Sequence, residues 1–309
     1  MKIKALKPND TIGLICPSSK ADMTSSRLPK MEEILSHWGY HVRYGASCYQ
    51  EDGYLAGTDE KRIQDIINMF KDPTINAIIC LKGGYGASRI IDAIDFNIIR
   101  ANPKLFIGFS DITVLLNNFY TKASLPTIHG QVGIFLGSPK QDDFSLTDFK
   151  TLLQQPQQGR ILKSPAPALT LSSGVAEGVM VGGNLSLIAT LVGTPYQIDF
   201  KDHIVLIEEV NEAPYRIDRM FSQLRLSGAL KQAKGVVLGH FTDCQDAAPT
   251  SRTVDMLCQE YFGSLGIPVL SHFATGHDFP FINCPIGLRV KLDANRQTLT
   301  IMEELYEKN

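Results

Sequence analysis

One serine stands where an apolar run meets a segment of helical character, within Leu105–Ile112. The run Leu105–Phe109 predicts a strand, and Ser110 and Asp111 follow it directly. A strand that turns sharply into a helix can present a serine hydroxyl at the carboxyl edge of a sheet, beside N–H groups that hold a negative oxygen. On this stretch alone a plain helix cap is favoured, because Ser and Asp are common caps and caps outnumber catalytic serines.

A glycine-rich loop, Lys82–Gly86, follows a second apolar run at Ala77–Leu81. Glycines at the end of a strand let the backbone approach a ligand, or let N–H groups converge on an anion. The pattern is neither GxGxxG nor a P-loop, so it supports nucleotide binding only weakly, and a tight turn explains it equally well. In a parallel sheet this loop and Ser110 would share the edge where ligands bind.

Two acids, Glu208 and Glu209, close the apolar run that begins at Ile204. Strand alternation points their side chains to opposite sides, so one can face a site while the other meets solvent. An isolated acidic pair is more often a solvated strand end. The residues alone leave open which glutamate, if either, is functional.

A histidine, His277, lies in the polar loop Thr275–Pro280. A loop histidine flanked by Gly and Asp is a candidate general base, and an exposed surface histidine is an equal alternative. The chain order Ser, Glu, His occurs in nucleophile triads, although order alone is not diagnostic. In such a triad His277 would accept the proton of Ser110, and the acid would fix the imidazole tautomer.

An oxyanion would then need backbone donors. The N–H groups of Asp111 and of Gly83 or Gly84 are the candidates. His129 follows a predicted strand and is a candidate for the lining of the same site.

The elements that must position these residues alternate in the first half of the chain. Strands are expected at Thr11–Cys16, His41–Tyr44, Ala77–Leu81 and Leu105–Phe109, and helices at Lys30–Trp38, Asp59–Phe70 and Ser88–Ile94. Strand–helix alternation at this spacing predicts a parallel sheet with helices on both faces.

The amino-acid composition changes near residues 154–174, where prolines and glutamines are frequent and apolar residues are few. We therefore expect an N-terminal α/β domain over 1–153, a linker over 154–174 and a C-terminal β/α domain over 175–309. Strands are expected at Val175–Val181, Ile204–Glu208, Gly235–Leu238 and Val269–Leu270, helices at Asn184–Leu191 and Arg219–Leu226, and a final hairpin at Leu288–Leu292 and Thr298–Ile301.

The amino-acid composition of the chain limits the classes of function to be considered. The chain has 309 residues, 44% hydrophobic and 20% charged, with a net charge of −2 and no block of Lys or Arg, so neither a nucleic-acid nor a membrane partner is indicated. Its six cysteines form no CxxC pair and no zinc pattern, so no metal is expected. The absence of a signal-like or membrane-length apolar run favours a reduced, cytoplasmic, soluble protein.

Taken together, the motifs resemble the LD-carboxypeptidase family of serine peptidases, which includes muramoyltetrapeptide carboxypeptidases and microcin-immunity peptidases. The resemblance runs in order through Gly13–Ser18, Lys82–Gly86, Ile107–Asp111, Gly182–Leu185, Ile207–Glu209, Ala213–Arg219 and Gly276–His277. It implies a Rossmann- or flavodoxin-like N-terminal domain with a parallel sheet, a mixed β/α C-terminal domain, and an active site in the cleft between them. It also implies a homodimer and no metal or organic cofactor.

Carried over by resemblance, Ser110 is the nucleophile and His277 the base. Glu208 is the first glutamate after the apolar strand and so takes the acid's position, with Glu209 as the fallback. The implied reaction releases D-alanine from a murein tetrapeptide during cell-wall recycling.

A carboxypeptidase must hold the free carboxylate of its substrate, which the forked donors of arginine suit. Arg216 is a candidate for this role, although it can instead pair with Asp218 or Glu212, and Tyr85 and His129 are further candidate contacts. Two alternatives remain: an amidase acting on a peptidyl-nucleotide toxin, and a non-catalytic small-molecule binding protein. The Pro214–Arg216 match resembles the carboxypeptidase branch more than the microcin-immunity branch.

Overall fold

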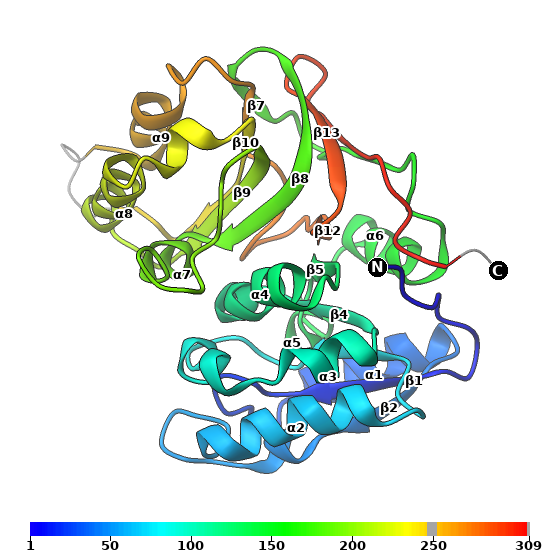
Figure 1. Ribbon diagram of the computed structural model, residues 1–309. Helices are drawn as coiled ribbons and strands as arrows, with labels where there is room; N and C mark the ends of the chain where they lie inside the picture. Colours follow the sequence, from blue (N-terminus) through cyan, green and yellow to red (C-terminus); the bar gives the residue numbers. More distant parts are fainter. Residues whose placement is uncertain (246–251, 308–309) are drawn as a thin grey trace. The chain divides into compact units, whose positions relative to one another are not determined.

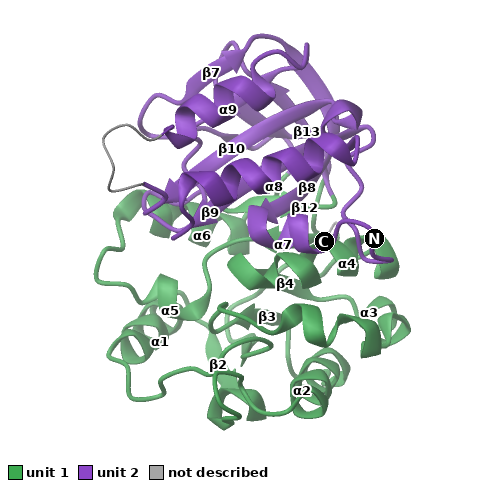
Figure 2. Ribbon diagram, turned by 90° about the vertical axis from the view of Figure 1, so that its left-hand side faces the viewer, with its two compact units in different colours: residues 1–157, 283–287, 304–309 green, residues 158–282, 288–303 purple. Residues whose placement is uncertain are grey.

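The computed structural model describes residues 1–245 and 252–307, which form two compact units (Figure 2). Unit 1 contains Met1–Gln157, Asn283–Gly287 and Glu304–Asn309, and unit 2 contains Gln158–Ile282 and Leu288–Glu303. Two short C-terminal segments therefore return to unit 1 instead of staying with the expected 175–309 domain. The expected linker 154–174 carries two strands of the sheet of unit 2.

Unit 1 is built on a six-stranded sheet with the order β12-β5-β4-β3-β1-β2. Its strands are β1 (Thr11–Ile15), β2 (His41–Tyr44), β3 (Ala77–Cys80), β4 (Leu105–Gly108), β5 (Thr127–His129) and β12 (Cys284–Ile286). The first five are parallel, and β12 joins the edge antiparallel to β5. The predicted parallel sheet is confirmed, and its central strands are apolar throughout because both of their faces are covered.

Helices cover both faces of this sheet, with α2, α3 and α4 on one face and α1 and α5 on the other (Figure 1). The helices of unit 1 are α1 (Arg27–His37), α2 (Asp59–Lys71), α3 (Phe96–Ala101), α4 (Thr113–Ala123), α5 (Gly133–Leu136) and α6 (Asp143–Gln154). Helix α2 matches its prediction because Thr58 caps it and its apolar face, with Ile66 and Phe70, is buried.

The helix expected at Ser88–Ile94 is wrong. That stretch forms two 3-10 turns, η2 (Ala87–Arg89) and η3 (Ile91–Ala93), and the α-helix begins only after Asp95, which caps α3. Short 3-10 turns commonly serve as connectors, and here they carry the chain from Gly86 to that cap. Two further 3-10 turns in unit 1 are η1 (Ala46–Tyr49) and η4 (Ser110–Ile112).

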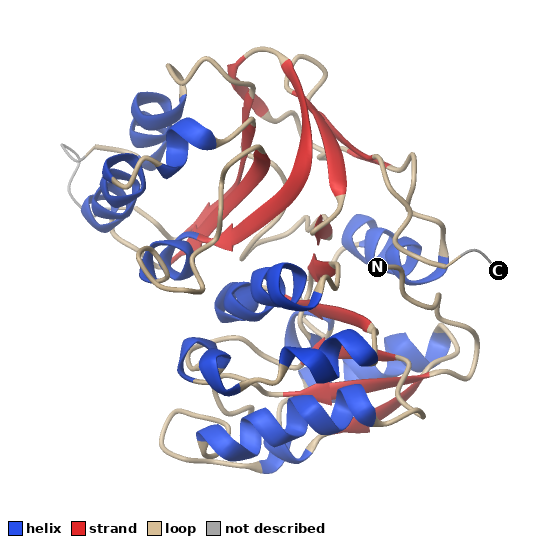
Figure 3. Cartoon of the chain, in the orientation of Figure 1, coloured by secondary structure: helices blue, strands red, loops and turns tan. Residues whose placement is uncertain are grey.

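Unit 2 is built on an eight-stranded mixed sheet with the order β6-β14-β13-β8-β9-β10-β11-β7. Figure 3 draws strands in red and helices in blue. Its strands are β6 (Ile161–Leu162), β7 (Leu169–Ser172), β8 (Val175–Asn184), β9 (His203–Val210), β10 (Gly235–Thr242), β11 (Val269–Ser271), β13 (Arg289–Asp293) and β14 (Thr298–Ile301). Strands β8 to β11 run parallel, and β13 and β14 form the predicted antiparallel hairpin.

The helices of unit 2 lie on one side of its sheet (Figure 1). They are α7 (Leu185–Thr190), α8 (Pro214–Leu226) and α9 (Val254–Phe262), with a 3-10 turn η5 at Ala229–Gln232. Phe221 of α8 is fully buried and packs against Phe262 of α9 and Phe241 of β10, which fixes α8 and α9 on the parallel strands. In the described part of the chain, no helix has the length and apolar character that crossing a bilayer requires.

Candidate active site

Ser110 lies at the turn from β4 into α4, at the carboxyl end of the parallel sheet of unit 1. Its φ of 64° places a non-glycine residue in the left-handed region, which is uncommon and often marks a functional residue. Ser110 does not cap α4, since that helix begins after Ile112 and has no side-chain cap. The geometry therefore favours a presented hydroxyl over the plain helix cap.

The glycine-rich loop lies directly against this hydroxyl. A Cβ on Gly83 would lie 3.0 Å from the Ser110 Cβ and 3.2 Å from its Oγ. The loop is tied down by Ser19, whose N–H donates to Gly83 O at 3.3 Å and whose Oγ accepts from the Tyr85 N–H at 3.0 Å. Gly84 has a φ of 105°, which glycine adopts at little cost. The sequence prediction that the loop and the serine share one edge is confirmed within unit 1.

Asp111 holds two neighbouring loops through its side chain. Its buried carboxylate accepts from Ser18 Oγ at 2.5 Å and from the Ala87 N–H at 2.8 Å. Burial raises the pKa of Asp111, and the hydrogen bonds from Ser18 and Ala87 and the charge of Arg62 oppose that rise. The carboxylate is thus a tether between the end of β1 and the end of the glycine loop.

Arg62, which the sequence analysis missed, supports the same loops from α2. It is fully buried, and its Nη1 donates to Pro17 O at 2.5 Å and to Gly86 O at 2.9 Å, while Nη2 pairs with Asp59. Arginine is rarely buried unless it is paired, so its position joins the chain before Ser18 to the end of the glycine loop. The signal in the sequence is slight, because Arg62 sits among the polar residues of an amphipathic helix.

In unit 2, Glu208 and His277 form a close pair. Glu208 is fully buried near the end of β9, and its Oε2 lies 2.6 Å from Nδ1 of His277, whose side chain is 13% exposed. Gly276 makes room for the carboxylate, since a Cβ there would lie 2.9 Å from the same oxygen. A carboxylate only accepts, so Nδ1 donates, and the neutral ring then offers Nε2 as a proton acceptor.

Two opposing effects act on the His277 imidazole. Burial lowers the pKa of His277, whereas the charge and hydrogen bond of Glu208, aided by the charge of Glu209, raise it. The net direction is a pKa above the ordinary 6.5. The pair therefore stabilises an imidazolium, which is what a general base becomes when it takes a proton.

Glu209 faces other partners. Its carboxylate accepts from Asn184 Nδ2 at 2.9 Å, from the Ser186 N–H at 2.8 Å and Oγ at 2.7 Å, and from its own neighbour, the Val210 N–H, at 2.8 Å. Burial, followed by the charge of Glu208, raises the pKa of Glu209, and these hydrogen bonds oppose the rise. Glu209 thus joins β9 to the start of α7, and Glu208 is the acid that contacts His277.

Comparison with known proteins gives the relationship. Residues 12–130 match the family model described as "LD-carboxypeptidase N-terminal domain". Residues 177–292 match the model described as "LD-carboxypeptidase C-terminal domain". The probable murein peptide carboxypeptidase of Bacillus subtilis is 35% identical over 97% of this chain and 94% of its own length. The chain belongs to the LD-carboxypeptidase family. The resemblance predicted from the motifs is thereby confirmed, and the chain is a member of a peptidase family.

Other members of the LD-carboxypeptidase family agree in sequence and fold. The murein tetrapeptide carboxypeptidase of Pseudomonas aeruginosa is 32% identical over 92% of this chain and 94% of its own length. The wild-type microcin C7 self-immunity protein superposes with a TM-score of 0.91 at 26% identity, covering 99% of this chain and 100% of that one. Muramoyltetrapeptide carboxypeptidase of Oxalobacter formigenes gives a TM-score of 0.81 at 28% identity, over 96% and 100%.

The three residues predicted to contact substrate in this LD-carboxypeptidase differ in their exposure and in their partners. Arg216 is exposed on α8 and pairs with Glu212 at 3.3 Å, which is one of the local pairings considered for it. Tyr85 is 48% exposed, and its ring lies 5.7 Å from that of Tyr54. His129 is fully buried, with its ring 5.9 Å from that of Phe109, and so supports the Ser110 turn from inside unit 1.

The described residues contain no cluster of side chains that could bind a metal ion. Across 1–245 and 252–307 no three His, Cys, Asp or Glu side chains are grouped to hold an ion. All six cysteines are buried thiols.

Proposed function

We propose that this chain is a serine-type LD-carboxypeptidase that releases D-alanine from a murein tetrapeptide. The bond hydrolysed joins the L-centre of meso-diaminopimelate to the terminal D-amino acid. The observation that carries the proposal is the buried Glu208–His277 pair at 2.6 Å, because a histidine oriented by a carboxylate is the general base of a nucleophile triad. The strained, presented Ser110 supplies the matching nucleophile. The names of the murein peptidase relatives support the substrate.

Acylation would proceed as follows. The Ser110 Oγ attacks the carbonyl carbon, and its proton passes to Nε2 of His277 while Glu208 stabilises the resulting imidazolium. The carbonyl oxygen becomes an oxyanion, for which the N–H groups of Asp111 and of Gly83 or Gly84 are the proposed donors. The C–N bond then breaks, and the proton held by His277 passes to the amine of the departing D-alanine.

Deacylation would use the same groups. His277 takes a proton from water, which attacks the ester carbonyl of the acyl-enzyme, and the collapse of the second tetrahedral intermediate returns a proton to Ser110 Oγ. The products are free D-alanine and the shortened peptide with a free carboxylate.

We also propose that the enzyme works in the cytoplasm as a homodimer. Six cysteines that all remain thiols are typical of a reducing compartment, and a recycling substrate would be met there. Size-exclusion chromatography with light scattering tests the dimer, and a monomeric mass at micromolar concentration would contradict it.

The second candidate is an amidase that acts on a peptidyl-nucleotide. The TM-score of 0.91 with the microcin C7 self-immunity protein favours it, whereas the higher identity to murein peptidases favours the first candidate. Parallel assays on murein tetrapeptide and on an aminoacyl sulfamoyl nucleotide decide between them. Hydrolysis of the nucleotide substrate without hydrolysis of murein tetrapeptide would favour the amidase over the carboxypeptidase.

The first experiment compares release of D-alanine by the wild type and by Ser110→Ala. We expect release that the substitution abolishes, with an unchanged melting temperature as proof of folding. Labelling of Ser110 by a fluorophosphonate provides a second readout, which should also require His277. Release that survives in a folded Ser110→Ala protein would refute the assignment of the nucleophile.

A further inference from the structure

The segment that carries the base ends where the chain passes from unit 2 to unit 1. Unit 2 runs to Ile282, and the next residue, Asn283, begins the stretch that belongs to unit 1. His277 lies only six residues before Asn283 in the chain. The contacts of Asn283 therefore fix one end of the segment that carries the base.

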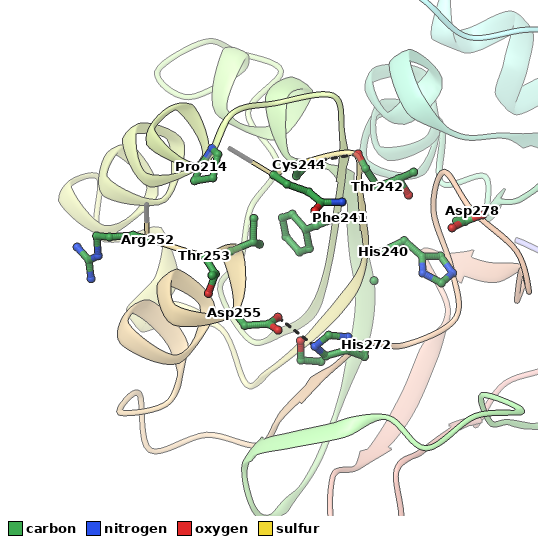
Figure 4. Close-up of a pocket in the computed structure, with 14 residues that line it drawn as sticks. Pro214, His240, Phe241, Thr242, Cys244, Arg252, Thr253, Asp255, His272 and Asp278 are labelled. Carbon is green, nitrogen blue, oxygen red and sulfur yellow. Dashed lines mark hydrogen bonds and ion pairs between the residues drawn. The ribbon is translucent and has the colours of Figure 1, made fainter. Parts of the chain in front are cut away.

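Within unit 2, hydrogen bonds close the loop of the base and hold it against β10. The Ile282 N–H donates to Ala274 O at 2.6 Å, and Thr275 Oγ1 donates to Ile282 O at 2.8 Å. His240 of β10 lies beside this loop (Figure 4). Its N–H donates to Thr275 O at 2.8 Å, and its Nε2 lies 3.1 Å from Pro280 O. The loop is thus a closed piece of chain whose exit is Ile282.

The side chain of Asn283 joins two other segments of unit 1 to the start of β12. It is 1% exposed, and both its N–H and its Nδ2 donate to Oδ2 of Asp148 in α6, at 2.9 and 2.7 Å. Its Oδ1 accepts from the Gln131 N–H, just after β5, at 3.1 Å. A Cβ on Gly130 would lie 2.8 Å from the same oxygen, so a glycine there leaves room for the amide. Both ends of the buried amide are therefore engaged.

The strand that follows Asn283 is in register with the strands that lead to Ser110. Cys284 of β12 pairs with His129 of β5, and His129 pairs with Gly108 of β4. Gly108 lies two residues before Ser110. Because β12 runs antiparallel to β5, Asn283 lies at the carboxyl edge of the sheet, which is the edge that presents Ser110.

A three-residue edge strand has few ladder bonds of its own to define its register. The amide of Asn283 supplies what the ladder lacks, because a donor for Asp148 and an acceptor for Gln131 must meet at one position. An apolar side chain at this position would pack in several registers, whereas the amide satisfies its buried partners in one.

We infer that Asn283 is a positioning residue for the base: by fixing the register of β12 on β5, it sets where the segment of His277 joins the sheet that carries Ser110. The inference rests on the proposed function. Proton transfer requires the two reacting heavy atoms to approach within about 2.6–3.2 Å. A slip of one residue along a strand moves the chain by about 3.3 Å, which is enough to separate them.

The test replaces the amide by a carboxylate of the same shape. Asn283→Asp keeps an acceptor for the Gln131 N–H and places an oxygen where Nδ2 now donates to Asp148. We expect kcat for release of D-alanine to fall about tenfold to a hundredfold, as a displacement of about 1 Å produces, with KM little changed. Labelling of Ser110 by a fluorophosphonate should slow by the same factor. Adding Asp148→Asn restores a donor between the two side chains and should recover most of the lost kcat.

The pH–rate profile separates positioning from a loss of stability. Glu208 still contacts His277 in Asn283→Asp, so the acid limb should stay at the wild-type pH while the plateau falls. A variant that was only less stable would keep the wild-type plateau when assayed well below its melting temperature.

Thr127→Val is the matched control at the other end of the same strand pair, where Thr127 of β5 pairs with Ile286 of β12. It removes a buried hydrogen bond from Oγ1 to Leu116 O at 3.0 Å, so it should lower the melting temperature and leave kcat and labelling unchanged. If Asn283→Asp does not fold, Asn283→Ala takes its place in the same comparison.

Wild-type kcat and labelling in a folded Asn283 variant would overturn the inference and leave the peptidase intact. An equal loss of kcat in Thr127→Val would also overturn it, since any weakening of this sheet edge would then have the same effect. A wild type that neither releases D-alanine nor reacts at Ser110 would refute the proposed function, and the inference would fall with it.

Discussion

Neutralising each of the two adjacent glutamates should separate their roles. Glu208→Gln removes the charge beside His277 and keeps the size of the side chain, whereas Glu209→Gln removes a charge that contacts Asn184 and Ser186. We expect the first variant to lose turnover and the second to lose mainly stability. Each variant is the matched control of the other, since both positions are buried and adjacent on β9.

The expected loss in Glu208→Gln follows from the charge that develops on His277. A unit charge about 4 Å from another, at an effective dielectric of about 20, contributes about 4 kcal/mol. Each 1.4 kcal/mol changes a rate about tenfold, so kcat should fall about 10³-fold. A glutamine that presents its NH₂ to Nδ1 would also favour the wrong tautomer, which can enlarge the loss to about 10⁴-fold.

The cost in Glu209→Gln has a different origin. Four hydrogen bonds from four donors reach the Glu209 carboxylate, so the amide NH₂ of a glutamine must face at least one donor. An unsatisfied buried group costs about 1–3 kcal/mol, which lowers the melting temperature.

The assay measures kcat for release of D-alanine together with thermal unfolding for both variants. Near-normal turnover in a folded Glu208→Gln, or a 10³-fold loss confined to Glu209→Gln, would refute the assignment of the acid.

Two further outcomes are expected. Because the pKa of His277 is raised, kcat/KM should fall as the pH drops through a value above 6.5, and Glu208→Gln should move this acid limb to lower pH, which a pH–rate profile checks. The same shift implies that the pair adds stability that is complete below pH 6.5 and fades as the pH rises through the folded-state pKa of His277, as thermal melts across this range would show. Gly83→Ala should reduce kcat about tenfold to a hundredfold at an unchanged melting temperature, because its Cβ would crowd Ser110 Oγ at 3.2 Å; full activity would show that the loop lies farther from the reaction.

Local sequence patterns predicted most of the strands and helices of unit 1. Apolar runs with glycine-rich ends predicted β3 and β4, and 3.6-residue periodicity with a threonine cap predicted α2. The same reasoning failed at Ser88–Ile94, where a connector with helical spacing forms 3-10 turns. It also missed strands β6 and β7 in 161–172, since a short edge strand gains its stability from a partner that is distant in sequence.

Long-range pairing also explains why unit boundaries were hard to predict. Strand β12 is three residues long and pairs with β5 across more than 150 positions of the chain. Periodicity within a window gives no signal of such a partner, so Cys284–Ile286 seemed to belong with the sequence around it. Arg62 was hidden for a related reason: its acceptors, Pro17 O and Gly86 O, are backbone atoms of loops that only the folded sheet brings to α2.

For the two glutamates, the sequence predicted the directions of the side chains, and the structure was needed to identify which of them contacts the histidine. Alternation along β9 required their side chains to point to opposite sides, and they do: one contacts His277 and the other contacts Ser186. Which side carries chemistry depends on the strand register. Asn184 of β8 pairs in register with Glu208, so the end of β8 and the start of α7 are placed to donate to Glu209. The β8–β9 register therefore satisfies one acid completely with structural donors, and this leaves the other acid to hold the base.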